Sequence, residues 1–555
     1  MRIMNNEVNR AQGAKKKTIV FLTGATGTMG FAGMTEILKY PDQYELRILA
    51  RPSKKNKELL TPLLEQHQIL HVIWGDLTKY EDVLKGVTGA DIVLHVGGMV
   101  SPQADYRPKA TLRTNITAAE YLTKAVLAQP EDQQPKVVYI GSVAQMGDRR
   151  EPLHWGRAGD PICVSAYDHY GLTKALAERI ITDSGIQKWA SLRQSGILYP
   201  AILKNYDPIM FHVPIRGVLE WATVEDSGHL LERVCRPEVP AQFWNNYYNI
   251  GSGKEYRLSN YEFEVLLLDA IGCPKPEKIF NANWFTTRNF HGMWYIDGDK
   301  LENFLHFRAN VPVKEYFAKM AQAKSLPGGI KFAAKTHIAK LFPHCIKAAM
   351  WFMANSKEHG TQWWIKGAES KDESRKSKAL QRISAYYGSL KAYKAIPDWA
   401  HFDVSHNSET PVLLDHGYDE SKPMEELSMD DLRKAALFRG GKCLGTAKGD
   451  KAQEKKELKG LDLWDTQILW EDANGNTFEA TPRLILLGGH WSPYDMPLPY
   501  DEKTLSSFNF QLPTTPWHWD RVAKQNPFFA QLWSPLHEPG EDNIYGPEIF
   551  DGWEK

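Results

Sequence analysis

The sequence predicts an α/β protein whose first half is a doubly wound parallel sheet with a small second lobe. A mixed α+β extension is expected to follow it. From Lys17 onward, apolar runs of strand length alternate with helical patterns, which is typical of a parallel sheet covered by helices. A glycine-rich turn between Gly24 and Gly30 joins the first run to the first helical pattern. Beyond about residue 320 the alternation stops, so a different architecture is expected there.

Five apolar runs are predicted to be strands of the sheet. They are the run that begins at Lys17, Leu46–Ala50, Leu70–Trp74, Asp91–Val96 and Lys136–Ser142. In a doubly wound sheet the carboxyl ends of the strands border the crevice in which ligands bind. Residues that follow these runs are therefore candidates for a binding site.

The glycines of the first turn have the spacing of a dinucleotide-binding turn. Gly24 permits the tight turn, Gly27 lets backbone N–H groups approach a pyrophosphate, and Gly30 lets the helix lie close to its strand. A plain tight turn is the alternative, but the place between strand and helix favours nucleotide binding. The predicted cofactor contacts are Gly24, Thr26, Gly27, Thr28, Met29, Gly30, Arg51, Asp76, Leu77, Gly97, Gly98, Tyr170 and Lys174.

The second predicted strand ends in a basic group. Arg51 follows it directly, and three lysines lie just beyond. An NAD site usually places an acidic residue here for the ribose 2′-hydroxyl, whereas a basic group suits a 2′-phosphate. NADP(H) is therefore the favoured cofactor and NAD(H) the possible one; a solvated basic loop is the alternative reading of the same residues.

Tyr170 and Lys174 are four residues apart in a helical segment, so their side chains share one face. Such pairs also occur by chance on surface helices, and a catalytic role needs a third polar group, which Ser142 supplies at the end of the fifth strand. A free tyrosine titrates at about pH 10, and a nearby ammonium favours its phenolate. We expect Tyr170 to transfer a proton, Lys174 to tune it and Ser142 to orient a substrate oxygen.

Several ordered motifs resemble the short-chain dehydrogenase/reductases. The motifs are TGATGTMG, GDL, HVGG, Asn115, Ser142, YGLTK and ALAE, and they are most similar to the extended branch, the NAD-dependent epimerase/dehydratase type. The resemblance covers roughly residues 17 to 320. It implies a Rossmann sheet with a substrate lobe, a catalytic Ser142, Tyr170 and Lys174, and an Asn115 that supports a water near the lysine. The HVGG stretch departs from the commoner pair of alanines, and glycine is smaller still.

The substrate lobe lacks the arginine that nucleotide-sugar members of that family carry shortly before a late strand. Apolar residues occupy the neighbourhood, namely Leu198, Tyr199, Met210, Phe211, Leu219 and Trp221. Such residues belong to a core more often than to a pocket. If some of them line the site, they favour a hydrophobic carbonyl or alcohol as substrate.

Composition excludes several classes of protein. Lys plus Arg equals Asp plus Glu, 67 each, so no overall field attracts nucleic acid. The five cysteines form no CxxC pair, and no metal is expected. The N-terminus lacks the apolar core of a signal peptide and no long uncharged apolar run occurs, so we expect a cytoplasmic protein without stable membrane insertion.

The second half offers less chemistry. Residues 326–423 are predicted to be a helical linker region whose lysine-rich amphipathic stretch lies on a neighbouring domain or, alternatively, on a membrane surface. Residues 424–500 resemble a zinc-ribbon-like module with the pattern W-x-C-x-x-G-H-x-F and later W-C-P-x-C. Poor zinc ligands stand at the ligand positions, so the module is expected to be held by Trp470, Phe478 and Trp491 instead of a metal. These residues are Asp472, Asn476, Ser492 and Asp495.

The domain prediction places a flexible tail at 1–16, the dehydrogenase domain with its lobe at 17–325 and an aromatic-rich tail at 501–555. This last tail is expected to cover the surface of the dehydrogenase domain or of a second subunit, which makes a homodimer possible. The leading functional hypothesis is an NADP(H)-dependent oxidoreductase that acts on a moderately hydrophobic small molecule. The alternatives are an epimerase or dehydratase that recycles its cofactor within one turnover, and a cofactor-sensing interaction protein without catalysis.

Overall fold

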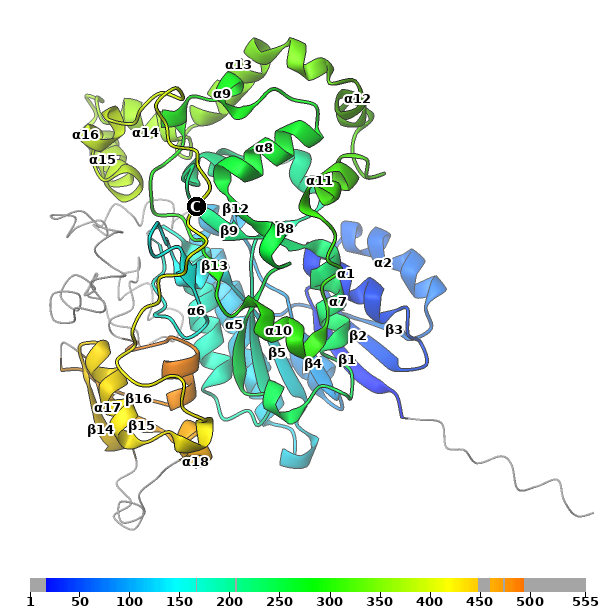
Figure 1. Ribbon diagram of the computed structural model, residues 1–555. Coiled ribbons are helices and arrows are strands. Elements are labelled where there is room, and N and C mark those ends of the chain that lie inside the picture. Colours follow the sequence, from blue (N-terminus) through cyan, green and yellow to red (C-terminus); the bar gives the residue numbers. More distant parts are fainter. Residues whose placement is uncertain (1–15, 166, 205–206, 448–459, 473–474, 494–555) are drawn as a thin grey trace, which may run out of the picture.

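The computed structural model of the protein describes residues 16–165, 167–204, 207–447, 460–472 and 475–493. At its centre lies a seven-stranded parallel sheet of order β11-β7-β5-β4-β1-β2-β3 (Figure 1). Its strands are β1 (Thr18–Thr23), β2 (Tyr44–Ala50), β3 (Leu70–Trp74), β4 (Ile92–His95), β5 (Lys136–Ser142), β7 (Trp189–Gln194) and β11 (Asn246–Ile250). The doubly wound sheet predicted from the sequence is confirmed, and its topological switch lies between β1 and β4.

Both faces of the sheet are buried because the strands are apolar on both sides. Val20 and Leu22 of β1 face one core and Phe21 between them faces the other, as the period of two requires. Helices cover each face. They are α1 (Thr28–Ile37), α2 (Lys54–Gln66), α7 (Val224–Arg233) and α10 (Gly298–Leu305) on the side of Val20, and α3 (Tyr80–Val87), α5 (Pro108–Leu127) and α6 (His169–Thr182) on the side of Phe21.

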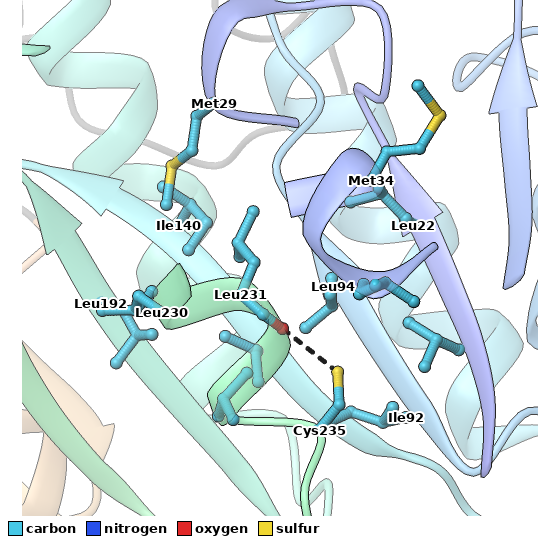
Figure 2. Close-up of a cluster of buried hydrophobic side chains, with 14 of the residues drawn as sticks. Leu22, Met29, Met34, Ile92, Leu94, Ile140, Leu192, Leu230, Leu231 and Cys235 are labelled. Atoms are coloured by element: carbon cyan, nitrogen blue, oxygen red, sulfur yellow. Dashed lines mark hydrogen bonds between the residues drawn. The ribbon is translucent and has the colours of Figure 1, made fainter. Parts of the chain in front are cut away.

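Figure 2 shows the core under α1 and α7, where Leu22, Ile92, Leu94, Ile140 and Leu192 meet the two helices. The two helices touch closely because Gly33 of α1 faces Leu231 of α7: a Cβ on Gly33 would lie 2.4 Å from a Leu231 methyl carbon. Cys235 donates its thiol to the Leu231 carbonyl at 3.2 Å. The α1–α7 contact thereby fixes the helix that follows the glycine turn.

The second lobe is built from short strand pairs and helices above the carboxyl ends of the sheet (Figure 1). β8 (Ile197–Leu198) pairs with β10 (Ala222–Thr223), β9 (Val218–Glu220) with β12 (Arg257–Ser259), and β6 (Trp155–Gly156) with β13 (Trp294–Tyr295). Its helices are α4 (Gln103–Tyr106), α8 (Asn260–Ala270), α9 (Pro276–Ile279) and α11 (Val313–Ala321).

The helical region after it lies on this lobe. Met350 and Ala354 of α13 are buried against Phe280 and Trp284 of the lobe, so one face of the lysine-rich stretch rests on a neighbouring part of the chain. Its helices are α12 (Gly328–Thr336), α13 (Pro343–Ala354), α14 (Thr361–Gly367), α15 (Glu373–Tyr387) and α16 (Leu390–Lys394). The opposite face is exposed, with Leu341 74% and Phe352 69% accessible.

The last part described is a small module beside α6. An antiparallel sheet of order β14-β15-β16 packs on α17 (Met429–Phe438). The strands are β14 (Lys442–Thr446), β15 (Ile468–Glu471) and β16 (Thr477–Ala480), and α18 (Leu461–Trp464) precedes β15. Trp470, Phe478 and Trp491 are buried together, with ring centroids 5.7 and 5.2 Å apart for the Trp470–Trp491 and Phe478–Trp491 pairs.

The positions that would hold zinc in the ribbon-like pattern hydrogen-bond one another. Asp472 accepts bonds from the Asn476 backbone (2.9 Å), the Asn476 amide (3.1 Å) and the Ser492 hydroxyl (2.8 Å). Asp495 lies outside the described residues, as do the two predicted tails except Lys16. No group of three possible metal ligands occurs in the described part of the chain. The ribbon resemblance, the absence of a metal and the domain boundaries stay predictions.

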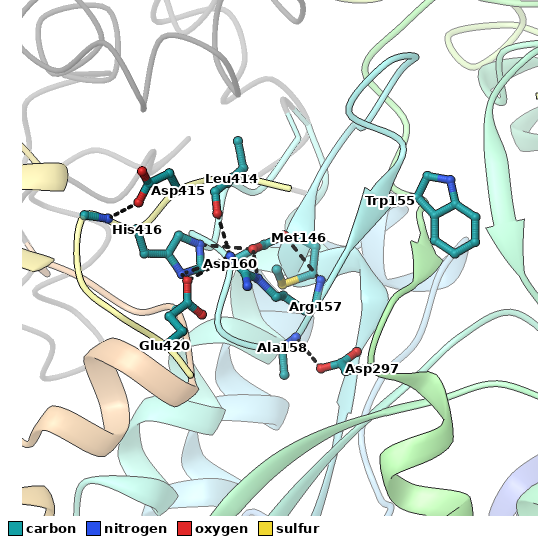
Figure 3. Close-up of polar contacts among 12 residues, drawn as sticks. Met146, Trp155, Arg157, Ala158, Asp160, Asp297, Leu414, Asp415, His416 and Glu420 are labelled. Atoms are coloured by element: carbon teal, nitrogen blue, oxygen red, sulfur yellow. Dashed lines mark hydrogen bonds and ion pairs between the residues drawn. The ribbon is translucent and has the colours of Figure 1, made fainter. Parts of the chain in front are cut away.

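The segment between α16 and α17, here called the strap, leads from the helical region to this module and contacts the loop after β5. Figure 3 shows Asp160 in that loop, where Arg157 and His416 surround its carboxylate at 3.1 Å each. Arg157 also donates to the Leu414 carbonyl at 2.6 Å and lies 2.9 Å from Glu420. The strap is thus held to the first half by buried charges. None of the described helices is long and apolar enough to cross a membrane.

Candidate active site

The glycine turn between β1 and α1 is a close approach of backbone to backbone. Gly24 has a φ of +75°, and a Cβ there would lie 2.7 Å from the Gly97 backbone after β4. A Cβ on Gly30 would lie 2.2 Å from the Gly24 carbonyl oxygen. Gly27 is the N-cap of α1 and offers no side-chain acceptor, so the first N–H groups of the helix are left for an anion.

The other predicted turn residues surround this helix start. Met29 is buried in the core, whereas Thr26 is half-buried and Thr28 is exposed. The outer surface of the turn is therefore accessible to solvent, whereas Met29 anchors it to the core. The N-terminus of α1 is thus accessible from solvent at Gly27 and Thr28.

The ends of β2, β3 and β4 meet beside the turn. Burial opposes ionisation of Asp76, but hydrogen bonds from Thr78 and the nearby charge of Arg51 bring the pKa of its carboxyl below the usual value. Gly97 is enclosed by Leu77, since a Cβ would lie 2.8 Å from a Leu77 methyl carbon. A Cβ on Gly98 would lie 2.9 Å from the Asn115 side-chain oxygen. Apart from Asn115, these residues follow the carboxyl ends of β2, β3 and β4, on both sides of the switch point of the sheet.

Ser142, Tyr170 and Lys174 come together across β5 and α6. Ser142 ends β5, and its hydroxyl lies against the Tyr170 phenol, where it lowers a pKa that burial raises to about 12. Lys174 donates from Nζ to the Ile140 carbonyl at 2.7 Å and lies 6.0 Å from the centre of the Tyr170 ring. Burial lowers the pKa of Lys174 to about 8, and the charge of Glu178 acts against that shift.

Asn115 of α5 is buried, and in the described part of the chain its side-chain hydrogen bonds go to residues other than Ser142, Tyr170 and Lys174. Its amide donates to the Thr173 hydroxyl at 2.9 Å and to the Met99 carbonyl at 3.1 Å, and its oxygen accepts the Met99 N–H at 2.7 Å. It therefore ties the loop after β4 to the helix that carries Tyr170 and Lys174. Its predicted role beside the lysine stays a prediction.

The start of α6 holds a cluster of charges that the sequence analysis did not find. Asp168 is the N-cap and accepts the Gly171 N–H at 2.6 Å, while its second oxygen lies 2.6 Å from His291 Nδ1. Asp105 accepts the Tyr170 N–H at 3.3 Å, and burial, then the charge of Asp168, raise the pKa of its carboxyl. The one local signal in the sequence for this cap is Asp168, which stands two residues before Tyr170 at the start of the helix.

An apolar cavity of about 630 Å³ lies in the lobe. Of the six apolar residues considered from the sequence, Met210, Leu219 and Trp221 line it, whereas Leu198 and Phe211 belong to hydrophobic clusters. His291 also lines the cavity, so one side chain separates it from the Asp168 cap of α6. The cavity thus borders the start of the helix that carries Tyr170 and Lys174.

A buried network connects α6 to the C-terminal module. Glu178, one turn beyond Lys174, accepts bonds from Arg193 (Nη2 2.6 Å), Ser191 (2.6 Å) and His490 (2.8 Å). Arg193 also donates to the Gly488 carbonyl at 2.5 Å. No motif marks this network, because Glu178 and His490 are 312 residues apart in the chain.

The sheet order, the glycine turn and the meeting of Ser142, Tyr170 and Lys174 are similar to those of the extended short-chain dehydrogenase/reductases, the resemblance already given by the sequence. Residues 21–202 match the model of the 3-beta hydroxysteroid dehydrogenase/isomerase family. The curated relatives include 3 beta-hydroxysteroid dehydrogenase type 7 of Mus musculus (24% identical) and of Homo sapiens (25%), each over 190 residues that make up 32% of this chain and 48% of the relative. The chain spans about half the length of these relatives.

Further similarities are more distant. A stretch of 261 residues is 23% identical to the adenylate-forming reductase Nps9 of Serpula lacrymans and covers 40% of this chain and 23% of that protein. Among solved structures, the dTDP-glucose 4,6-dehydratase DesIV of Streptomyces venezuelae, with NAD and TYD bound, is 16% identical and superposes with a TM-score of 0.44. That similarity covers 58% of this chain and 99% of DesIV.

Proposed function

We propose that the protein is an NAD(P)(H)-dependent oxidoreductase that interconverts a carbonyl and a secondary alcohol on an apolar small molecule. The observation that carries the proposal is the meeting of Ser142, Tyr170 and Lys174, with an apolar cavity whose lining residue His291 contacts the Asp168 cap of the helix that carries Tyr170 and Lys174. The mouse and human relatives are named as dehydrogenases of a hydroxysteroid, which supports an apolar alcohol or ketone as the class of substrate.

The chain's own residues fit a dinucleotide. Gly24 and Gly30 leave no room for a Cβ, Gly27 leaves the first N–H groups of α1 without a side-chain cap, and Gly98 lies so close to Asn115 that a Cβ would meet its side-chain oxygen. A pyrophosphate at the N-terminus of α1 would meet backbone donors and the positive end of the helix dipole. When bound, the nicotinamide accepts or supplies the hydride.

The trio handles the proton. The Ser142 hydroxyl donates to the substrate oxygen and holds it beside the Tyr170 phenol, which gives or takes the proton at that oxygen. Burial, and after it the charges of Asp168 and Asp105, raise the pKa of Tyr170 against the hydrogen bond with Ser142, so its phenol is protonated and can donate at neutral pH. The positive charge of Lys174 favours the phenolate that forms when a carbonyl is reduced, so the proton moves more readily.

We further propose a preference for NADP(H). Arg51 follows β2 directly, is exposed and faces Asp76, so a guanidinium stands at the strand end where a 2′-phosphate would lie. Dissociation constants of NADPH and NADH for the parent and for Arg51→Ala test this step. A loss confined to NADPH is expected; equal affinities in both proteins would refute the preference and leave NAD(H).

The function is tested with Tyr170→Phe and the matched control Tyr121→Phe, a half-buried tyrosine on the neighbouring helix α5. Loss of the phenol should lower the rate of ketone reduction by on the order of 100-fold or more without weakening NADPH binding, while the control keeps the parent rate. A Tyr170→Phe enzyme as active as the parent would refute the assignment. Turnover without net change in nicotinamide absorbance would point instead to an epimerase or dehydratase.

A further inference from the structure

One wall of the apolar cavity is a single face of α8. The lining residues are Asn260, Phe263, Glu264, Leu267 and Leu268 of α8 and its C-cap Ile271, and this spacing of three and four is the stripe expected for a helix that faces a core. Phe263, Leu267, Leu268 and Ile271 are apolar, as the stripe requires, and Asn260 is the first residue of the helix. Glu264, in the middle of the stripe, is the exception.

The Glu264 carboxyl is buried without a partner. The residue is 5% exposed, and no hydrogen bond or ion pair to its side chain occurs in the part of the chain that the structure describes. Burial alone raises the pKa of its carboxyl to about 8. A polar group buried in this way costs about 1–3 kcal/mol of stability unless something meets it.

The other ionisable groups that line the cavity already have partners. Asp207 accepts the Tyr106 hydroxyl at 2.6 Å, and Asp148 accepts the Asn289 N–H at 2.8 Å. Arg149 lies 2.7 Å from Asp160 in the adjoining loop. His291 is paired with Asp168, so Glu264 is the acidic side chain without a hydrogen-bond partner among the described residues of the lining; Nε and Nη2 of Arg149 also lack one, but they can only donate.

We propose that Glu264 hydrogen-bonds a second oxygen, a hydroxyl or a carbonyl, that an otherwise apolar substrate carries away from its reacting carbon. The inference rests on the proposed function, because it takes the cavity to be the place of the substrate. A neutral carboxyl both donates and accepts, so it recognises either kind of oxygen. The apolar lining binds the carbon skeleton, and Glu264 selects molecules with an oxygen at the right separation.

A neutral ligand is favoured over an amine because an ammonium must leave water to reach this cavity. The lining offers it no further free carboxylate, since Asp148 and Asp207 are engaged. Transfer of an unshared charge into an apolar cavity costs several kcal/mol, whereas a hydroxyl loses little. An amine-binding site is therefore the outcome that the experiment must be able to reveal.

The test measures binding and needs no turnover. Terminal alkanediols of increasing chain length and the alkanols of equal length displace an apolar fluorescent dye from the parent, Glu264→Leu and Glu264→Gln. The diol-to-alkanol affinity ratio at the best chain length should fall about 10-fold or more in Glu264→Leu and stay near the parent value in Glu264→Gln, because an amide also donates and accepts. Asp269→Asn, which removes an exposed acid from the same helix, should leave the ratio unchanged.

Two results would overturn the inference. An unchanged ratio in Glu264→Leu would mean that Glu264 meets no ligand oxygen, and an alkylamine that outcompetes the diol and loses this advantage in Glu264→Gln would mean a cation site. Tyr170→Phe should keep the parent ratio. An active Tyr170→Phe would refute the proposed function and leave the binding result standing, so the two failures are distinguishable.

A second inference comes from the outer surface of the helical region. Between Glu315 and Glu358 the sequence has seven lysines and no acidic residue, in a protein without net charge. Within residues 332–352 six large apolar side chains are exposed by more than a third: Phe332, Ile338, Leu341, Phe342, Trp351 and Phe352. Figure 1 shows α12 and α13, which carry this surface, at the end of the molecule remote from β1.

The same segment forms a wall of the cavity on its inner side. Ala339, Cys345, Ile346, Ala349 and Met350 line the cavity, while their neighbours Leu341, Phe342 and Phe352 face outward. We infer that residues 331–352 dock on an anionic lipid surface without crossing it. The lysines meet the headgroups, the apolar side chains enter the interface, and a substrate dissolved in the lipid is close to the cavity.

Co-sedimentation with neutral and with partly anionic phospholipid vesicles tests the docking. The parent should bind anionic vesicles at least 10-fold more tightly than neutral ones, and salt should weaken the binding. Leu341→Asp and the double variant Lys331→Glu with Lys335→Glu should each lose about 10-fold or more, whereas Leu461→Asp, at an exposed leucine of α18, should match the parent.

Equal binding to both kinds of vesicle, or none, would overturn the docking. So would a parent whose self-association, measured by light scattering, is abolished by Leu341→Asp without any binding to vesicles. In that case the surface would be an interface between two copies of the chain.

Discussion

The Glu178→Gln substitution probes the buried network that joins α6, the helix of Tyr170 and Lys174, to the C-terminal module. Both Glu178 and Arg193 have fully buried side chains, and Arg193 contacts the carboxylate through Nε at 3.0 Å and Nη2 at 2.6 Å. The amide removes the negative charge and leaves the Arg193 guanidinium buried without a counter-charge. Breaking a buried pair from one side costs about 3–5 kcal/mol in free energy of unfolding.

Glu232→Gln is the matched control. Glu232 is also buried, but its partner Arg236 has a side chain that is 28% exposed and can turn to water when the charge is lost. We expect a loss of about 1 kcal/mol there, in the range of ion pairs that water reaches. Urea unfolding followed by tryptophan fluorescence measures both variants. If the two variants lose the same free energy of unfolding, or Glu178→Gln loses less, the access of water to the arginine does not decide the cost of removing its counter-charge.

Glu178→Gln should also change the pH dependence of catalysis. Glu178 is the charge that holds the pKa of Lys174 up to about 8 against burial. Without it the pKa of the lysine falls, so the ammonium beside Tyr170 is lost at lower pH. The alkaline limb of the rate profile should move to lower pH, whereas the Glu232→Gln profile should coincide with that of the parent.

Three further outcomes follow from the contacts described. Gly30→Ala should abolish measurable dinucleotide binding in calorimetry, since the new Cβ would lie 2.2 Å from the Gly24 carbonyl oxygen; Gly329→Ala, with nothing within 4 Å, should bind normally. Burial raises the pKa of the Glu264 carboxyl from 4.5 to about 8 in the folded protein, so the folded state favours the protonated form. The stability linked to this protonation is fully present below pH 4.5 and is lost as the pH rises through 8. Glu264→Gln should therefore have a higher Tm than the parent at pH 9 but not at pH 4.5. Asp472→Ala should lower the free energy of unfolding of the module by about 1–3 kcal/mol, and a chelator should not change the Tm of the parent; stoichiometric zinc would contradict this.

Much of the first half follows from local patterns. β3 and β5 have the bounds expected from their apolar runs, and Tyr170 and Lys174 share a face of α6 because a helix repeats about every 3.6 residues. The glycine turn is recognisable because its three positions each solve a local steric problem. These features depend on neighbours in the chain, so the sequence displays them.

Other features of the site have no local signal. Asp105 of α4 and His291, both in the lobe, join the start of α6, and the cavity is closed by α8 and α13, which are far apart in the sequence. Glu264 looks like any glutamate of a helix until α13 and the lobe exclude water from it. A prediction of burial needs the long-range contacts, which periodicity does not contain.

The amino-acid sequence by itself determined the alternation of strands and helices, the glycine turn and the Ser142, Tyr170 and Lys174 set, because backbone preference and side-chain period act over a few residues. Only the tertiary structure decided which side chains lose contact with water. It placed His490 against Glu178 and an unpartnered Glu264 in an apolar cavity, and it left the outer face of α12 and α13 open. Desolvation depends on what packs from elsewhere in the chain, and the chemistry of these groups depends on desolvation.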